Sequence, residues 1–196
     1  VAIVWAKLEG AEDKPVRGFL VERSFKGFST PKIRHKMSLR ASWTGEIVLE
    51  DCFVPEANLL PGVQGLKGPL SCLTQARYGI AWGALGAGLA CFDTALSYSQ
   101  ERTQFSKPIA GFQLTQLKLV NMGAKLVNGQ LLAIHLANLK DQGLLTPIQV
   151  SLGKRQNVGN ALEIARTARS ILGGNGVSAE YPIMRHAANL ESVYTY

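Results

Sequence analysis

The sequence predicts an α+β chain in which the end of an antiparallel β-barrel, or a small antiparallel sheet, precedes an antiparallel helical bundle. Residues 1–62 hold short apolar and β-branched runs separated by Gly and Pro, a pattern typical of strands. From about Leu70 the composition changes to Ala, Leu and Gln with helical spacing. Glycine and proline interrupt the helical pattern, which is typical of the joints between the helices of a bundle.

Strand-like runs fill the first third of the chain. VAIVWAKL opens the sequence, RGFLVER covers residues 17–23, and a longer β-rich run covers residues 46–54. Pro15, Gly27 and Pro55 separate or close these runs, because proline and glycine disrupt a strand ladder. Since the first run begins without a preceding turn or cap, we expect further strands of this sheet upstream and interpret the chain as a fragment.

Four helices are expected, over residues 70–101, 113–142, 147–172 and 182–194. Pro108 and Gly111 force the first joint, and Gly143 ends the second helix. The second helix should also carry a broad apolar face. The residues expected on this face are Leu114, Leu117, Val120, Leu126, Leu131, Ile134 and Leu139.

The composition favours a small anionic ligand over nucleic acid. The chain of 196 residues has 21 Lys and Arg and a net charge of +7, but the basic residues are scattered and never form a run of four. Cys52, Cys72 and Cys91 lie far apart without metal-ligand spacing, so we expect reduced thiols and no metal site. We also expect no apolar stretch that could span a bilayer.

Few residues stand out as candidates for chemistry. His35, His135 and His186 fall in neither a nucleophile-elbow nor a metal-ligand pattern, which argues against a hydrolase. Arg102 ends a predicted helix just before a sharp break. A cation at this position could bind a phosphate, cap the C-terminus of the helix or form a surface ion pair. The glycines of GGNG (residues 173–176) permit positive φ, which suits a helix stop or a close approach of the backbone to a flat or anionic ligand.

Four blocks of the sequence together resemble the acyl-CoA dehydrogenase family, in the same order as in that family. They are KMSLRASWTGEIVLEDCFVPEANLLPG (36–62), ARYGIAWGALGAG (76–88), ERTQFSKPIAGFQLTQLKLVNM (101–122) and LGGNGVSAEYPIMR (172–185). Within the family, LTQARYGIAWG, LKDQG, KRQNVGNALEIAR and RHAANLESVYTY look most like the glutaryl-CoA dehydrogenase branch. The blocks cover most of the chain.

The resemblance implies an arrangement of domains and a cofactor. Residues 1–62 would be part of a middle β domain, and residues 63–196 an incomplete C-terminal helical bundle domain. FAD would lie between such domains, with a neighbouring subunit of a homotetramer completing its site. A protein of this type would be cytoplasmic in a bacterium and would lie in the mitochondrial matrix in a eukaryote.

The resemblance also implies a reaction. An acyl-CoA thioester would be dehydrogenated at its α and β carbons, with electrons passing to an electron-transfer flavoprotein. In the glutaryl branch, which serves lysine and tryptophan degradation, the reaction yields crotonyl-CoA and CO2. Two alternatives stay open: another short-chain acyl-CoA dehydrogenase, and a non-catalytic bundle that serves as an assembly module.

Site residues follow from the resemblance position by position. Arg102 matches the arginine that reaches the FAD pyrophosphate, and Phe105 and Gln113 match further cofactor contacts. The segment along the ADP half of FAD matches Ser170, Ile171, Leu172, Gly173 and Gly174. The acyl-CoA-contacting stretch matches Leu70, Ser71, Cys72, Leu73, Thr74, Gln75, Ala76 and Arg77. Arg77 and Tyr196 would support the catalytic glutamate, which is expected directly after Tyr196, so no base is assigned within the chain.

Two positions depart from the family pattern. Ser106 stands where the family usually has glycine, and serine reaches positive φ less easily, so the loop is expected to sit differently. Ser170 is shorter than the usual glutamine or acid, so a direct cofactor contact is expected to become water-mediated.

Overall fold

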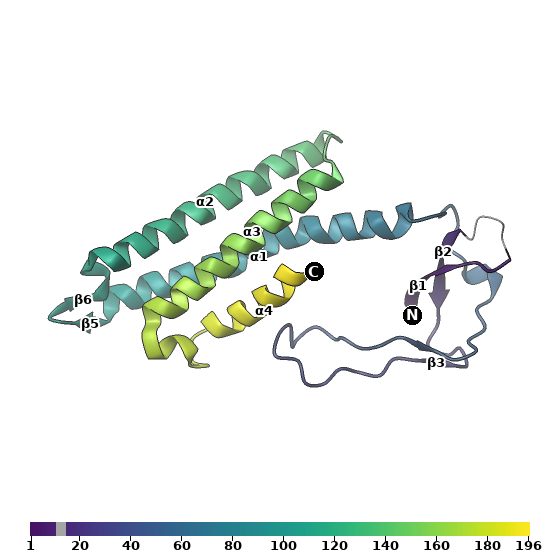
Figure 1. Ribbon diagram of the computed structural model, residues 1–196, viewed down its shortest axis with the longest axis horizontal. Helices are drawn as coiled ribbons and strands as arrows, with labels where there is room; N and C mark the ends of the chain where they lie inside the picture. The colour runs from purple at the N-terminus through teal and green to yellow at the C-terminus, as the bar shows by residue number, and fades with distance from the viewer. Residues whose placement is uncertain (11–14) are drawn as a thin grey trace. The chain divides into compact units, whose positions relative to one another are not determined.

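The computed structural model describes residues 1–10 and 15–196. The chain divides into two compact units, which we describe separately (Figure 1). The β unit consists of residues 1–36 and 40–75, and the helical unit consists of residues 37–39 and 76–196. The expected division into domains at residue 62 concerns the whole protein and stays a prediction.

The β unit contains short antiparallel pairs of strands. β1 (Ala2–Lys7) pairs with β2 (Val16–Val21), with Ala2 opposite Val21 and Lys7 opposite Val16. β3 (Phe28–Ser29) pairs with β4 (Val48–Leu49). The expected strand over residues 46–54 is therefore wrong in extent, because only β4 finds a partner strand there and β3 offers just two residues. Small antiparallel sheets are confirmed, and a β-barrel stays a prediction.

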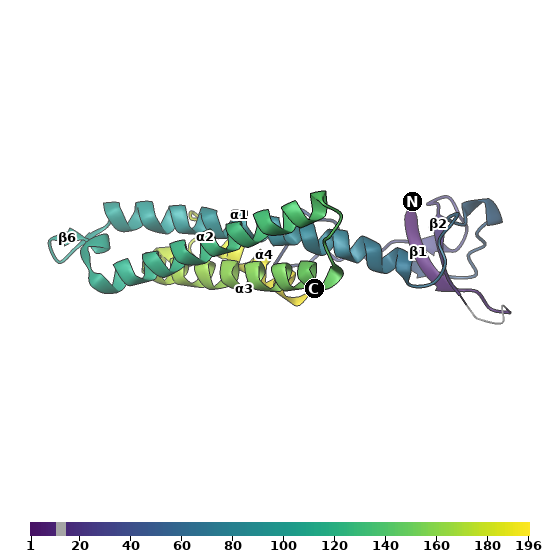
Figure 2. The same ribbon diagram turned by 90° about the horizontal axis from the view of Figure 1, so that it is seen from above.

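The helical unit follows the predicted pattern of helices closely. Its long helices are α1 (Lys67–Glu101, whose first turns belong to the β unit), α2 (Gln113–Asp141), α3 (Pro147–Leu172) and the shorter α4 (Ile183–Thr195). Figures 1 and 2 both show α3 lying beside α2, and α3 also packs on α4. Between α1 and α2 a hairpin joins β5 (Thr103–Gln104) to β6 (Lys107–Pro108).

The start of α3 shows why the sequence places a helix there. The Thr146 hydroxyl accepts a hydrogen bond from the Gln149 backbone N–H, and the Gln149 side chain accepts one from the Thr146 N–H. Pro147 occupies the first helical position, where its missing N–H costs nothing. This capping box fixes the point at which the chain turns from the α2–α3 joint into α3.

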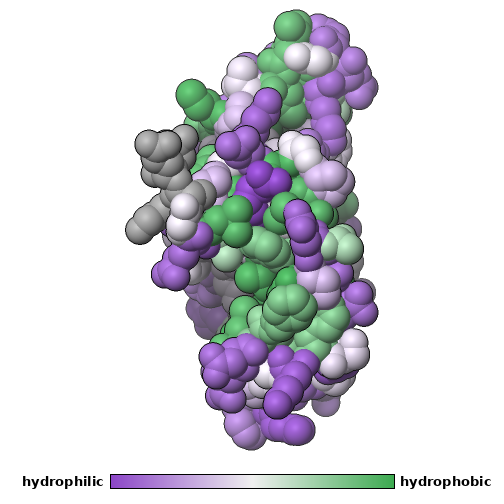
Figure 3. Space-filling view, turned by 90° about the vertical axis from the view of Figure 1, so that its right-hand side faces the viewer, coloured by the Kyte–Doolittle hydropathy of each residue, from purple (hydrophilic) through white to green (hydrophobic). Residues whose placement is uncertain are grey.

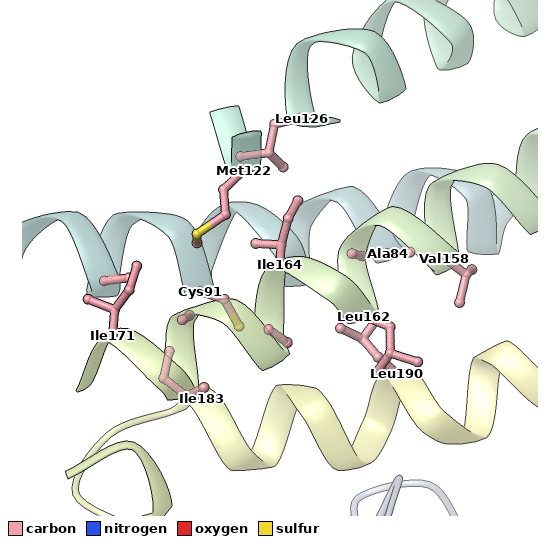
Figure 4. Close-up of a cluster of buried hydrophobic side chains, with 14 of the residues drawn as sticks. Ala84, Cys91, Met122, Leu126, Val158, Leu162, Ile164, Ile171, Ile183 and Leu190 are labelled. Carbon is pink, nitrogen blue, oxygen red and sulfur yellow. The ribbon is translucent and has the colours of Figure 1, made fainter. Parts of the chain in front are cut away.

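The core of the helical unit lies where all four helices meet (Figure 4). α1 contributes small residues such as Ala84 and Cys91, so the larger side chains of α2 and α3 can pack close to the α1 backbone. Larger buried residues labelled in Figure 4 are Met122, Leu126, Val158, Leu162, Ile164, Ile171, Ile183 and Leu190. The core therefore draws its apolar surface from residues between positions 84 and 193.

A buried asparagine links three of the helices. The Asn157 side-chain amide on α3 donates hydrogen bonds to the carbonyl oxygens of Ala81 on α1 and Gly129 on α2, at 3.0 and 3.2 Å. Its own Oδ1 has no hydrogen-bond partner among the described residues. A buried polar group costs free energy unless it is bonded, so Asn157 favours one alignment of these helices over others.

The apolar residues predicted along α2 lie mostly on its exposed side. Of the seven residues expected on that face, only Leu126 is buried, whereas Leu114, Leu117 and Val120 are more than half exposed. The buried side of α2 is instead formed by Met122, Leu126, Gly129, Ala133 and Leu136. α2 is apolar on more than one side, so its sequence pattern alone could not select the side that packs.

Exposed apolar side chains also occur on the β unit. Val1, Trp43 and Phe53 are each at least 80% exposed. The face of the molecule in Figure 3 shows green apolar areas between purple polar ones.

Length and composition would allow α1 to cross a bilayer, contrary to our expectation that no stretch could. A third of its most apolar window is buried inside the protein. Its buried residues include Ala84, Cys91 and Ala95 of the bundle core. A core helix of a bundle passes the same test of length and composition.

Candidate functional site

A cleft of about 400 Å³ opens in the helical unit between the end of α1 and the turn that follows α3. One wall comes from Tyr98, Arg102, Gln104 and Ile109, and the other from Ile171, Leu172, Gly173, Gly174 and Asn175. The structure therefore brings Arg102 together with most of the predicted 170–174 segment. Phe105 and Gln113 belong to the same unit, but they do not line the cleft.

The backbone of Arg102 is held from both sides. Its N–H donates to the Tyr98 carbonyl oxygen at 2.9 Å, which closes the last turn of α1. Its own carbonyl accepts from the Ile109 N–H at 2.9 Å, which closes the β5–β6 hairpin. The guanidinium is exposed and has no carboxylate within 4.0 Å in the described part of the chain. Arg102 thus has a fixed backbone and an exposed guanidinium that can bind an external anion.

The hairpin tip is conformationally strained. Phe105 and Ser106 both have positive φ, 52° and 66°, although neither is glycine. Ser106 reaches positive φ although serine does so less easily than glycine, because the two-residue turn between β5 and β6 imposes that conformation, and a loop that sits differently from the family's stays a prediction. The Phe105 ring is 88% exposed and touches Phe112 edge to face, with ring centroids 6.3 Å apart. Strain and an exposed aromatic ring together are typical of a functional loop.

The glycine turn begins where α3 ends at Leu172. Gly173 has φ 58° and ψ −127°, and its N–H donates to the Ser170 carbonyl. A Cβ at Gly176 would lie 2.3 Å from the carbonyl oxygen of Arg169, so the turn requires glycine there. At Gly174, by contrast, an added Cβ would meet no atom within 4 Å, so its backbone borders open space. The turn is both a helix stop and a backbone surface open to a ligand.

The remaining predicted cofactor residues differ in exposure. Ile171 and Leu172 are buried in the bundle core, so their side chains hold the turn in place. Ser170 is exposed, and its hydroxyl accepts a hydrogen bond from the Lys118 ammonium at 3.1 Å. The cleft thus offers a guanidinium, the Gln104 amide and glycine backbone, a set of groups that suits a ligand with several anionic oxygens.

The predicted acyl-CoA segment forms the first turns of α1. Residues 70–73, 75 and 76 are exposed, and Thr74 and Arg77 are half-buried. The Ser71 hydroxyl donates to the Gly68 carbonyl oxygen at 2.7 Å, and the Thr74 hydroxyl donates to that of Leu70 at 2.9 Å. Residues 70–75 belong to the β unit and Arg77 to the helical unit.

Arg77 lies near Lys154, which contacts Tyr196. The Lys154 ammonium donates to the Tyr196 carbonyl oxygen and lies 5.6 Å from the centre of its ring. Burial, followed by the positive charge of Arg77, lowers the pKa of Lys154. Neither cation has an Asp or Glu side-chain carboxylate within 4.0 Å in residues 1–10 and 15–196. Two cations therefore converge where the chain reaches Tyr196, an environment that suits a carboxylate.

A second cleft, of about 610 Å³, lies between residues 37–38 and α4. The Leu39 N–H donates to Asn189 Oδ1 at 2.7 Å, and the Ser192 hydroxyl donates to the Ser38 hydroxyl at 2.6 Å. Leu39 has φ 49°, which a non-glycine residue rarely adopts. Residues 37–39 form a clip that fastens α4, although about 150 residues separate the partners.

Sequence reasoning missed Tyr98, Gln104, Asn175 and Lys154. A signal existed for Tyr98, which precedes Arg102 by one helical turn and so shares its face of α1. Asn175 was noted only as part of the glycine run. Nothing in the sequence pattern relates Lys154 to Tyr196, because that contact depends on how α4 returns along α3.

Comparison with known proteins places these features in a family. Residues 63–196 match the family model described as acyl-CoA dehydrogenase, C-terminal domain. The chain is 32% identical over 185 residues to a short-chain-specific acyl-CoA dehydrogenase from Clostridium acetobutylicum, covering 92% of this chain and 48% of that protein. It is 34% identical over 190 residues to glutaryl-CoA dehydrogenase from Desulfococcus multivorans, covering 95% and 48%. The chain spans about half the length of these curated relatives.

Solved structures show the same likeness. A crystal structure of glutaryl-CoA dehydrogenase from Mycobacterium smegmatis superposes with a TM-score of 0.95 at 53% identity, covering 100% of this chain and 50% of that one. A glutaryl-CoA dehydrogenase from the same organism in complex with FADH2 also gives 0.95, at 49% identity and the same coverage. Butyryl-CoA dehydrogenase from Megasphaera elsdenii gives 0.90 at 31% identity, covering 99% and 51%.

Proposed function

The chain belongs to the acyl-CoA dehydrogenase family. We propose that it serves FAD-dependent α,β-dehydrogenation of an acyl-CoA thioester within a longer polypeptide. The observation that carries the proposal is the cleft between Arg102 and the glycine turn. A similar glutaryl-CoA dehydrogenase is known in complex with FADH2. The chemistry that FAD would supply is the acceptance of hydride from the β carbon.

The residues of the cleft fit the diphosphate of FAD. Arg102 supplies a charge that no carboxylate in the described residues neutralises, and a guanidinium binds phosphate oxygens through several N–H groups. The exposed backbone at Gly173 and Gly174 lets a bulky anion approach without meeting a side chain. Buried Ile171 and Leu172 keep that backbone in place, because they are anchored in the core.

The other end of the helical unit suits the acid–base part of the reaction. We assign Arg77 and Lys154 to the support of a carboxylate that follows Tyr196 in the whole protein. Their charges would stabilise the ionised form of that carboxylate, which is the form that accepts an α proton. Lys154 also contacts the Tyr196 carbonyl oxygen, which places this cation beside the residue that would precede the carboxylate. This assignment places the base beside residues that the structure already holds together.

For the substrate we propose glutaryl-CoA, converted to crotonyl-CoA and CO2. The 53% identity to the Mycobacterium smegmatis glutaryl-CoA dehydrogenase supports this choice over butyryl-CoA, since the butyryl-CoA dehydrogenase compared above is 31% identical. A second carboxylate in a partly dry pocket needs a cation or hydrogen-bond donors. We assign no described residue to that role, so the choice of substrate depends on the similarity.

Self-association is part of the proposal. Exposed apolar residues follow one another along α2 at intervals of three, four or seven, which places them on one side of the helix. They are Leu114, Leu117, Val120, Val127, Leu131 and Ile134. An apolar stripe of this length supports an interface with another subunit, and we propose a homotetramer. The electron acceptor we propose is an electron-transfer flavoprotein.

Removal of the Arg102 charge tests the cofactor site. In the full-length protein, Arg102→Ala should lose a charged hydrogen bond to phosphate, which is worth about 1.5–3 kcal/mol. FAD affinity should fall at least about tenfold, as measured by flavin absorbance after dialysis. Arg34→Ala, which removes an exposed arginine of the β unit, is the charge-matched control. Unchanged FAD affinity in Arg102→Ala would contradict the proposed role of the cleft.

Substrate choice is tested by kinetics. We expect kcat/KM for glutaryl-CoA to exceed that for butyryl-CoA and isovaleryl-CoA, with CO2 released in step with turnover. A tenfold preference for a monocarboxylic substrate, about 1.4 kcal/mol, would overturn the glutaryl assignment and leave the family unaffected.

A further inference from the structure

We propose that Tyr98 and Asn175 form a positioning pair that holds the two walls of the cleft at the separation a dinucleotide requires. The pair deepens the proposed function, since it concerns the same cofactor site. The Asn175 side-chain amide donates to the Tyr98 hydroxyl oxygen at 3.0 Å. Tyr98 belongs to the α1 wall and Asn175 to the glycine turn, which lies 77 residues further along the chain.

The two walls of the cleft share apolar packing in the core, but this is the one hydrogen bond between them among the described residues. No other hydrogen bond links the α1 and hairpin wall (residues 98–109) to the opposite wall (residues 171–175) in the part of the chain that the structure describes. Within the GGNG run, Asn175 is also the one residue with a side chain beyond hydrogen. Ile171 and Leu172 anchor the start of the turn in the core, and Asn175 is the one side chain of the GGNG run that can bond it to the opposite wall.

Tyr98 is well placed to serve as the fixed partner. Its backbone carbonyl accepts from the Arg102 N–H, so the phenol and the guanidinium arise four residues apart, at the end of α1 and directly after it. Its ring meets the Tyr181 ring edge to face, with centroids 5.7 Å apart and planes at 88°. Both rings are half-buried and pack on the bundle core. The hydroxyl direction is thus set by packing, because the ring has little room to swing.

The consequence is that the bond matters more to the ligand than to the fold. Asn175 is exposed, so water can replace its hydrogen bond when the cleft is empty. A bound dinucleotide instead needs the glycine backbone and Arg102 at one fixed separation. Without the bond, the turn becomes ordered only when FAD binds. The free-energy cost of that ordering lowers FAD affinity, while the apoprotein stays nearly as stable.

The test is a double-mutant cycle on FAD affinity in the full-length protein. Tyr98→Phe and Asn175→Ala remove one partner each, and the apoproteins are titrated with FAD by flavin fluorescence. Each variant should weaken binding about three- to tenfold. The double variant should be no weaker than the weaker single variant, because both changes remove the same bond. Tyr78→Phe is the matched control, about 30 Å further down α1.

Thermal unfolding of the apoproteins provides the second measurement. The unfolding midpoint of Tyr98→Phe should stay within the range of the Tyr78→Phe control. Unchanged FAD affinity, additive effects in the double variant, or a loss of apoprotein stability that accounts for the lost affinity would each overturn the positioning pair. A wild-type protein that binds no FAD would overturn the proposed function itself, and these outcomes are therefore distinguishable.

Discussion

The β unit and the helical unit differ in how much of a core each contains. In the described part of the β unit, Val21 is the one fully buried large apolar side chain, whereas the helical unit buries a continuous cluster from four helices. A two-stranded ribbon can cover little apolar surface by itself, while packed helices enclose theirs. The helical unit therefore contains the source of its own stability, whereas the described part of the β unit has almost no core of its own.

Removal of apolar volume from the helical core should have the largest effect. Ile164 is 1% exposed, so Ile164→Ala should lower the free energy of unfolding of the full-length protein by about 2–5 kcal/mol. Ile164→Val, the matched smaller change, should cost about 0.5–1.5 kcal/mol. Denaturant unfolding followed by circular dichroism measures both. Equal stability of the two variants would show that this core can collapse around a cavity, which would weaken the contrast with the β unit.

Thiol reactivity compares the two units within one sample. Burial raises the pKa of Cys91 to about 11, and this thiol of the helical unit is inaccessible, whereas Cys72 of the β unit is exposed. Iodoacetamide at pH 8 should label Cys72 at least about a hundredfold faster than Cys91, because Cys91 reacts only after the bundle opens. Peptide mapping by mass spectrometry measures both rates, and labelling in denaturant should equalise them. Similar rates in the native protein would argue against a closed helical core.

Relief of strain at the hairpin tip should have a smaller effect. Ser106 has φ 66°, a conformation that costs a residue with a Cβ about 1–2 kcal/mol. Glycine avoids this cost, but its greater conformational entropy in the unfolded state cancels part of the gain in stability. Ser106→Gly should therefore stabilise the protein by about 0.5–1 kcal/mol. Ser106→Ala, which keeps the strain, should bring no gain. Calorimetry measures the stability of both variants relative to wild type. A less stable glycine variant would mean that the Ser106 hydroxyl stabilises the protein by more than the strain costs.

The smallest expected effect concerns pH. Burial and the neighbouring Arg185 charge lower the pKa of His186 from its usual 6.5. The unfolded chain then binds this proton more readily than the folded protein does, so stability is complete above pH 6.5 and declines as the pH falls toward the lower folded pKa. The melting temperature of His186→Gln should depend less on pH between 7.5 and 5.5 than that of wild type. Parallel pH dependences would remove His186 as a contributor.

The helices could be predicted because their signals are local. Thr146, Pro147 and Gly173 mark helix ends within a few residues of where they occur, since caps and breakers act on their own turn. The side of α2 that packs could not be predicted, because that choice depends on α1 and α3. The short extent of β4 could not be predicted either, because the length of a strand depends on the partner strand with which it pairs.

The candidate site was predictable to the extent that it resembles a known family. Arg102 and the glycine turn stood out by residue type, and the structure places them in one cleft. The Asn175–Tyr98 hydrogen bond had no sequence signal, because its partners meet only after the bundle has folded. The contact between Lys154 and Tyr196 could not be predicted either, because these residues also meet only in the folded bundle.

The clip formed by residues 37–39 has a consequence for the order of events during synthesis. Its partners on α4 follow about 150 residues later in the chain. At translation speeds of about 5–20 residues per second, roughly 8–30 seconds separate the emergence of the two halves. The bonds between residues 37–39 and α4 cannot form until α1, α2 and α3 have been synthesised, so the docking of α4 is among the last steps in the folding of this unit.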